Sequence, residues 1–120
     1  MLFRSEKLLR QFPDDARASE SKELVGKLRE QLAAHELYVG RFYVRTKKSK
    51  AAISRLTGLL ERYPEHSGRD ESYFLLGQAY LLQGELELAR EKFDALSHDF
   101  PDSRFVAKAR KLLDKQQSRR

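Results

Sequence analysis

The sequence predicts an all-α protein, in which amphipathic helices follow one another and are separated by turns marked by proline. Apolar residues recur at spacings of three and four along most of the 120 residues, and no stretch shows the period of two that a half-buried strand requires. The three prolines each follow an aromatic residue, as Phe12-Pro13, Tyr63-Pro64 and Phe100-Pro101. Because proline cannot continue a helix, each pair marks a helix end, and the recurrence of the pair indicates an internal repeat.

The first elements are a partial repeat over residues 1–14 and a long helix after it. From about Ala16 to Thr46 there is no proline and no turn pair. An apolar stripe of helical period runs through this segment at Leu24, Leu28, Leu32, Val39 and Tyr43. We therefore expect one continuous helix about 45 Å long, at 1.5 Å per residue.

The remaining elements follow the same periodicity. Helical stripes precede Pro64 and Pro101, another stripe follows Gly68, and a last one runs from Phe105 to Leu113. Side-chain oxygens at three positions are expected to cap helices, namely Asp15, Asp70 and Ser103. These elements predict one domain over 1–115, with an extended-helix repeat at 15–66, a full repeat at 67–103, a capping helix at 104–115 and a disordered tail at 116–120.

Residues 70–103 are similar to a tetratricopeptide (TPR) repeat of 34 residues. The signature positions hold Tyr73, Leu76, Gly77, Tyr80, Ala89, Phe93 and Pro101. Residues 33–66 match less fully, at Gly40, Tyr43, Ala52 and Pro64. Small residues at Gly77 and Ala89 let two helices approach while aromatic side chains fill the gap between them. The fold expected is a TPR helical solenoid, in which one unit cannot bury its faces alone.

A narrower resemblance covers residues 35–64, which read HELYVGRFYVRTKKSKAAISRLTGLLERYP. This stretch resembles the middle of the BamD (YfiO/ComL) family of outer-membrane assembly lipoproteins. The family has an Arg-Gly turn where this chain has Thr46 to Ser49 without glycine. The resemblance implies a scaffold at the periplasmic face of the outer membrane, with BamA and other assembly-complex lipoproteins as partners. It also implies that a lipid anchor and further N-terminal repeats lie outside this chain.

Composition and motifs argue against catalysis. The chain has no cysteine, and its three histidines, His35, His66 and His98, lack the spacing of a metal site. Its six glycines stand singly, so no phosphate-binding loop is expected. We therefore expect neither an enzyme nor a bound cofactor or metal.

The charge pattern points to an anionic partner. Lys and Arg number 24 against 18 Asp and Glu, for a net charge of +6, and no acidic residue occurs between Glu36 and Glu61. This basic run fits either a solvated helix end or a site for an acidic partner. Its candidate partner-binding residues are Arg41, Arg45, Lys47, Lys48 and Arg55.

Arg55 lies one position before the apolar Leu56, so its side chain is expected to point away from the packed face. By resemblance, the matching family residue contacts a carboxylate on the periplasmic domain of BamA, and the planar guanidinium suits that role. An alternative is that Arg55 pairs with Glu61 or has no partner. The inner surface is expected to present Phe74, Gln78, Leu81 and Leu82. Exposed Phe74, Leu81 and Leu82 would form an apolar patch that suits a peptide or helix, unless the C-terminal helix covers it.

Two other functions remain open on the sequence alone. The C-terminal repeat also resembles other periplasmic TPR modules, such as the coordinator of the Tol-Pal system. The positive charge also fits a basic helical nucleic-acid binder, although nucleic acid is not the partner that we expect. A homo-oligomer could form through an exposed N-terminal repeat face.

Overall fold

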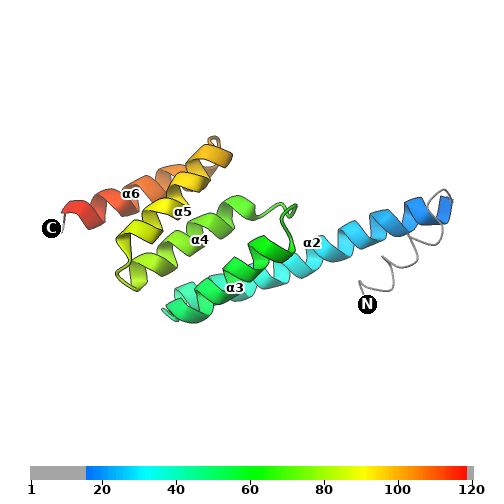
Figure 1. The fold of residues 1–120 in the computed structure, drawn as a ribbon, viewed down its shortest axis with the longest axis horizontal. Coiled ribbons are helices and arrows are strands. Elements are labelled where there is room, and N and C mark those ends of the chain that lie inside the picture. Colours follow the sequence, from blue (N-terminus) through cyan, green and yellow to red (C-terminus); the bar gives the residue numbers. More distant parts are fainter. Residues whose placement is uncertain (1–15, 119–120) are drawn as a thin grey trace.

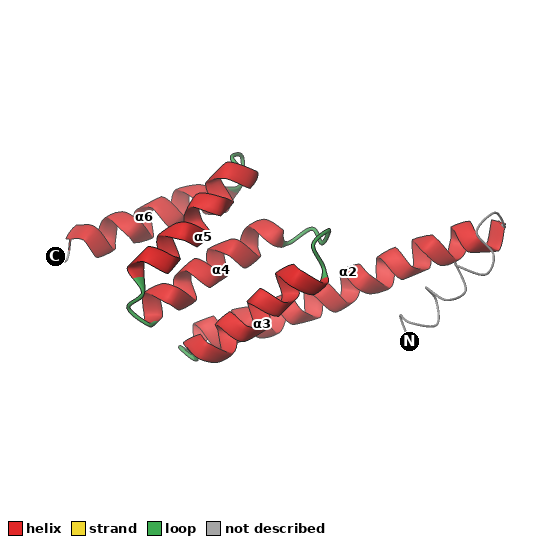
Figure 2. Ribbon diagram, viewed as in Figure 1, coloured by secondary structure: helices red, strands yellow, loops and turns green. Residues whose placement is uncertain are grey.

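The chain folds as a row of helices that pack on their neighbours in sequence order (Figure 1). A computed structural model describes residues 16–118, and Figure 2 shows only helices and loops in this range. The expected partial repeat over 1–14 and the Asp15 cap lie outside the described residues. The described helices are α2 (Ala16–Arg45), α3 (Ser49–Arg62), α4 (Arg69–Leu82), α5 (Leu86–Asp99) and α6 (Arg104–Ser118). This arrangement confirms the all-α class and is consistent with a TPR-like helical repeat.

The long helix is confirmed. α2 runs without interruption for 30 residues and ends at Arg45, one residue before the expected end. Its C-terminal half packs against α3 and α4, whereas its N-terminal half extends beyond the other described helices (Figure 1). None of the helices in residues 16–118 is long and apolar enough to span a membrane.

The turn between α2 and α3 contains a residue in the left-handed conformation, and this residue is not a glycine. Lys47 has a φ of 62°, a region that residues with a side chain seldom occupy. The backbone N–H of Lys48 donates to the carbonyl of Tyr43 over 2.8 Å and closes the turn. Gly84, in the turn between α4 and α5, has a φ of +80°, where glycine carries no steric cost.

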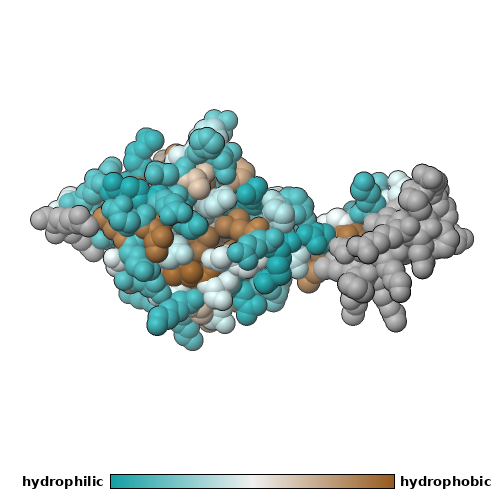
Figure 3. All heavy atoms as spheres, viewed as in Figure 1, coloured by the Kyte–Doolittle hydropathy of each residue, from teal (hydrophilic) through white to brown (hydrophobic). Residues whose placement is uncertain are grey.

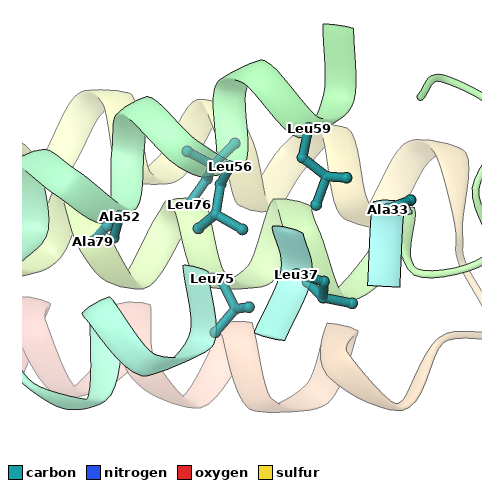
Figure 4. Packing of buried hydrophobic residues seen from close by; sticks show 8 residues of the cluster. All are labelled: Ala33, Leu37, Ala52, Leu56, Leu59, Leu75, Leu76 and Ala79. Atoms are coloured by element: carbon teal, nitrogen blue, oxygen red, sulfur yellow. The ribbon is translucent and has the colours of Figure 1, made fainter. Parts of the chain in front are cut away.

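Two hydrophobic clusters share α4. The first lies between α2, α3 and α4 and contains Leu37, Leu56 and Leu76 among its buried residues. Figure 4 shows Leu56 of α3 against Leu76 of α4. The second cluster joins α4 to α5 and α6, and the half-buried Tyr80 packs against both clusters. Tyr80 therefore lies at the junction of the two clusters.

Close helix approach depends on two glycines. A Cβ atom on Gly40 of α2 would lie 2.5 Å from a methyl carbon of Leu56. A Cβ atom on Gly77 of α4 would overlap ring carbons of Phe93 on α5. Since real Cβ atoms do not come this close to other carbons, these glycines set the distance between the helices of each pair.

The observed helix ends agree with those predicted from the prolines and capping residues, except at Asp70 and in the predicted tail at 116–120. α3 and α5 end two residues before Pro64 and Pro101, respectively. The hydroxyl of Ser103 accepts the N–H of Phe105 over 3.2 Å, so the expected cap of α6 is confirmed.

The prediction that Asp70 caps α4 is wrong, because α4 already begins at Arg69. The carbonyl of Gly68 instead accepts both the backbone N–H and the hydroxyl of Ser72, over 3.0 and 2.9 Å. Asp70 accepts a hydrogen bond from the Ser103 hydroxyl over 2.7 Å and thereby ties α4 to the start of α6. α6 continues to Ser118, so residues 116–118 are helical rather than part of a tail.

Candidate partner-binding site

Arg55 lies on α3 beside Glu36 of the long helix α2. Its Nη1 donates to both carboxylate oxygens of Glu36, over 3.2 and 3.4 Å. The side chain of Arg55 is still 42% exposed, whereas that of Glu36 is 18% exposed. The hydrogen bond to Glu36 is the main cause that raises the pKa of Arg55, followed by the charge of the same carboxylate. Arg55 therefore pairs with a carboxylate of another helix, rather than with Glu61 or with no residue, which were the two forms of the alternative.

A second cation shares the same carboxylate. Nη2 of Arg62, two helical turns further along α3 and more than half exposed, lies 3.7 Å from Glu36 Oε2. Two guanidinium groups therefore face one carboxylate and leave a local excess of positive charge. They line a shallow hollow of about 310 Å³ together with Tyr43, Ala51 and Ser54. The hydroxyls and guanidiniums of this hollow are hydrogen-bond donors for a further carboxylate.

Arg41 forms an ion pair with another residue of the same chain. Its Nε donates to Glu71 of α4 over 2.8 Å, and this hydrogen bond is the main cause that raises the pKa of Arg41. The pair links the long helix to the first turn of α4 across the repeat. Arg41 is 44% exposed, so the pair lies at the surface and is worth at most about 1 kcal/mol.

Four of the expected partner-binding residues come together elsewhere. Arg45, Lys47, Gln78 and Leu81 line a common groove at the C-terminal ends of α2 and α4. The guanidinium of Arg45 lies over the ring of Phe42, 5.7 Å from its centre. Lys48 precedes the first residue of α3, is exposed and does not line this groove.

Of the two outcomes expected for Phe74, the structure shows the one in which the C-terminal helix covers it, so Phe74 is not an exposed partner-binding residue. Phe74 is only 8% exposed, because α6 folds over α4 and places Phe105 against it. The ring centres of Phe74 and Phe105 are 5.1 Å apart, and Phe93 of α5 lies 6.1 Å away on another side. Phe74 therefore belongs to the second cluster, Leu81 is half-buried, and Leu82 is the most exposed leucine of this helix.

A polar clamp between α2 and the loop after α3 was not anticipated from the sequence. Arg29 of α2 donates to the carboxylate of Glu65 over 2.7 Å and to the carbonyl of Arg62 over 2.6 Å. Glu30 accepts the backbone N–H of Ser67 over 2.7 Å and its hydroxyl over 3.0 Å. These contacts join residues more than thirty positions apart, so no local sequence pattern reveals them.

His66 is buried within this clamp. It is 6% exposed, its Nδ1 accepts the N–H of Gly68 over 3.1 Å, and its buried Nε2 has no hydrogen-bond partner among the described residues. Desolvation lowers the pKa of His66, and nearby Arg69 also lowers it, whereas the charges of Glu30, Glu65 and Asp70 oppose this shift. The folded chain therefore favours the neutral imidazole.

We expect His66 to make the fold less stable below neutral pH. Since the folded pKa lies below the unfolded value of about 6.5, the unfolded chain takes up the proton first as the pH falls. The free energy of unfolding should therefore be unaffected above pH ~6.5 and decline below it. Urea titrations at a series of pH values between about 4.5 and 8 measure this decline.

The matched variants are His66→Asn and His98→Asn. Asparagine keeps an acceptor for the Gly68 N–H, so His66→Asn should flatten the pH profile even if it lowers stability overall. His98 has an 89% exposed side chain, and His98→Asn should keep the profile of the parent chain. A profile that keeps its slope in His66→Asn would contradict the assignment. The pKa of Glu65 is lowered, chiefly by its hydrogen bond to Arg29, so its contribution is lost only at more acidic pH.

Comparison of the sequence with known proteins identifies the family of this chain. A model of the YfiO family, described as outer membrane lipoprotein, matches residues 2–92. The outer membrane protein assembly factor BamD of Caulobacter vibrioides is 30% identical over 107 residues, which are 89% of this chain and 35% of that protein. BamD of Rickettsia prowazekii is 26% identical over 113 residues, 94% of this chain and 45% of the relative. BamD of Haemophilus influenzae is 30% identical over 86 residues, 72% of this chain and 33% of the relative.

The chain spans between a third and a half of the length of these curated relatives. The family match, however, covers more than half of the chain and includes all of α2, α3 and α4 together with the start of α5. It therefore contains the segment 35–64 on which the resemblance was recognised, and the chain belongs to the YfiO family of outer membrane lipoproteins.

Proposed function

We propose that this chain is a non-catalytic scaffold segment that binds a protein partner during outer-membrane protein assembly, at the periplasmic face of that membrane. The family and the names of its relatives, which are assembly factors, support this role. The observation that carries the binding site is the hollow around Arg55, where two guanidiniums share the single carboxylate of Glu36.

The hollow is suited to a carboxylate from a partner. Arg55 uses only Nη1 for Glu36, and a guanidinium has five N–H donors in a fixed plane. An incoming carboxylate can therefore be bound by Arg55 without breaking its pair with Glu36. Glu36 in turn holds the guanidinium in place, which reduces the conformational entropy lost on binding. By family resemblance, the partner that we propose is the periplasmic domain of BamA.

The test is a charge reversal at Arg55. We expect Arg55→Glu to weaken binding to that periplasmic domain by about 30-fold or more, which corresponds to roughly 2 kcal/mol, because the variant removes a paired cation and adds repulsion. The affinity is measured by isothermal titration calorimetry. Reversal of the partner's carboxylate to a cation should restore part of the binding to Arg55→Glu, since only a direct pair is rescued in this way.

Two control variants separate the contact from other effects. Lys50→Glu makes the same change in net charge at an exposed position of α3 and should bind like the parent chain. Glu36→Gln breaks the internal pair of Arg55 without removing the guanidinium, and should also retain binding. Equal binding by the parent chain and Arg55→Glu would remove Arg55 from the interface, and no binding by the parent chain would contradict the proposed partner.

A further inference from the structure

A second surface lies on the side of the molecule toward which the C-terminal ends of α2, α4 and α6 all point, on the left in Figure 1. The three helices enclose a groove of about 250 Å³. Its lining consists of Val44, Arg45, Lys47, Gln78, Leu81, Leu82, Leu112 and Gln116. None of these residues lines the hollow around Arg55, so the two surfaces can be tested independently.

The groove combines an apolar floor with cations on one wall. Leu82 is 45% exposed there, and Val44, Leu81 and Leu112 are half-buried around it. Figure 3 shows that most of the face in view is hydrophilic, apart from hydrophobic atoms gathered over the middle of the helices. Apolar side chains left open to solvent in a concave site are typical of a binding groove.

The charge around the groove is mainly positive. Arg45 and Lys47 line it, and no acidic residue is found among its described lining residues. The opposite wall, α6, carries five cations and only one acidic residue, Asp114. An occupant with carboxylates is therefore favoured, and one with exposed lysines is repelled.

The lining also discriminates between classes of anionic partner. It contains four aliphatic side chains and no aromatic one, whereas surfaces for single-stranded nucleic acid use aromatic rings on which bases stack. Aliphatic floors between polar rims are used for the apolar face of a helical segment. The occupant that fits is a protein segment with both leucine-like side chains and carboxylates.

We propose that this groove docks an acidic amphipathic helix of a protein partner, with its apolar side chains over Leu81, Leu82 and Leu112 and its carboxylates toward Arg45 and Lys47. This contact is separate from the one at Arg55 and does not depend on it. It makes the chain a scaffold with two binding surfaces on different sides of the long helix.

The probe is a labelled peptide of about 15 residues with leucines at helical spacing and glutamates between them. A peptide with lysine in place of each glutamate is the control. Fluorescence anisotropy with the full chain should give a Kd on the order of 100 μM for the acidic peptide, weaker at about 300 mM than at about 50 mM salt, and no binding of the lysine peptide. Amide chemical shifts should change around Leu82 and Leu112 and not around Arg55.

Variants locate the site. Leu82→Glu should weaken the acidic peptide at least tenfold, whereas Leu88→Glu, at a leucine that is 37% exposed outside the groove, should leave it unchanged. Arg45→Glu should weaken it, and Arg55→Glu should not. Equal affinities of the acidic and lysine peptides, equal effects of Leu82→Glu and Leu88→Glu, or binding of anionic vesicles or single-stranded DNA without binding of the peptide would each overturn the proposal.

Discussion

Replacement of Gly77 by leucine is expected to cost about 3 kcal/mol of the free energy of unfolding, at the upper end of overpacking effects. A Cβ atom at this position already overlaps the ring of Phe93, which is 2% exposed and packed in the second cluster. α4 and α5 would have to separate, and both hydrophobic clusters use α4. The expected fall in Tm, measured by circular dichroism, is roughly 10 °C or more.

Gly26→Leu is the matched control for this variant. Gly26 is exposed on α2, and among the described residues a Cβ atom there has no heavy atom within 4 Å apart from its own helix. Since glycine is the poorer helix former by about 0.8 kcal/mol, this substitution should raise stability slightly. If Gly77→Leu melted like the parent chain, the close approach of α4 and α5 would be contradicted.

The periodic features were predictable because they are local. The long α2 helix follows from an apolar stripe without proline, and the ends of α3 and α5 follow from Pro64 and Pro101. A helix needs only contacts between residues three and four apart, so the sequence contains the information directly. The same holds for the Ser103 cap, whose hydrogen bond spans two residues.

The pairs that build the candidate site were not predictable in this way. Glu36 and Arg55 are 19 residues apart, and Arg41 and Glu71 are 30 apart. Which charged residues meet depends on how the helices are placed against one another, and no pattern of neighbouring residues within one helix contains that information. In the sequence Glu36 stood out only as the last acidic residue before the basic run, and the structure places it where Arg55 and Arg62 of α3 meet.

Phe74 shows that contacts of apolar residues between helices are likewise not predictable from the local sequence. The 3.6-residue pattern places Phe74, Leu81 and Leu82 on one side of α4, but it does not say which part of that side α6 covers. The structure buries Phe74 at one end of α4 under Phe105 and leaves Leu82 exposed at the other end. The apolar stripe is therefore divided between core and groove by the position of one later helix.

The largest expected effect of a single truncation follows from this division. Phe74→Ala should cost about 3–5 kcal/mol, as for other buried phenylalanines, because it empties the space between Phe93 and Phe105. Leu82→Ala, on the same helix but 45% exposed, should change stability by about 0.5 kcal/mol or less. Urea unfolding monitored by circular dichroism compares the two variants.

Limited proteolysis adds a readout that is specific for α6. This helix carries five lysine or arginine residues, all potential trypsin sites, and cleavage requires local opening of the backbone. In Phe74→Ala the loss of the contact with Phe105 should release α6 from α4, so cleavage between residues 104 and 115 should accelerate well before the chain unfolds globally. Cleavage at the same rate in Phe74→Ala and Leu82→Ala would mean that Phe74 does not hold α6. The wall that α6 provides for the groove would then be held by the other α6 residues of the second cluster, such as Val106 and Ala109, rather than by the contact of Phe74 with Phe105.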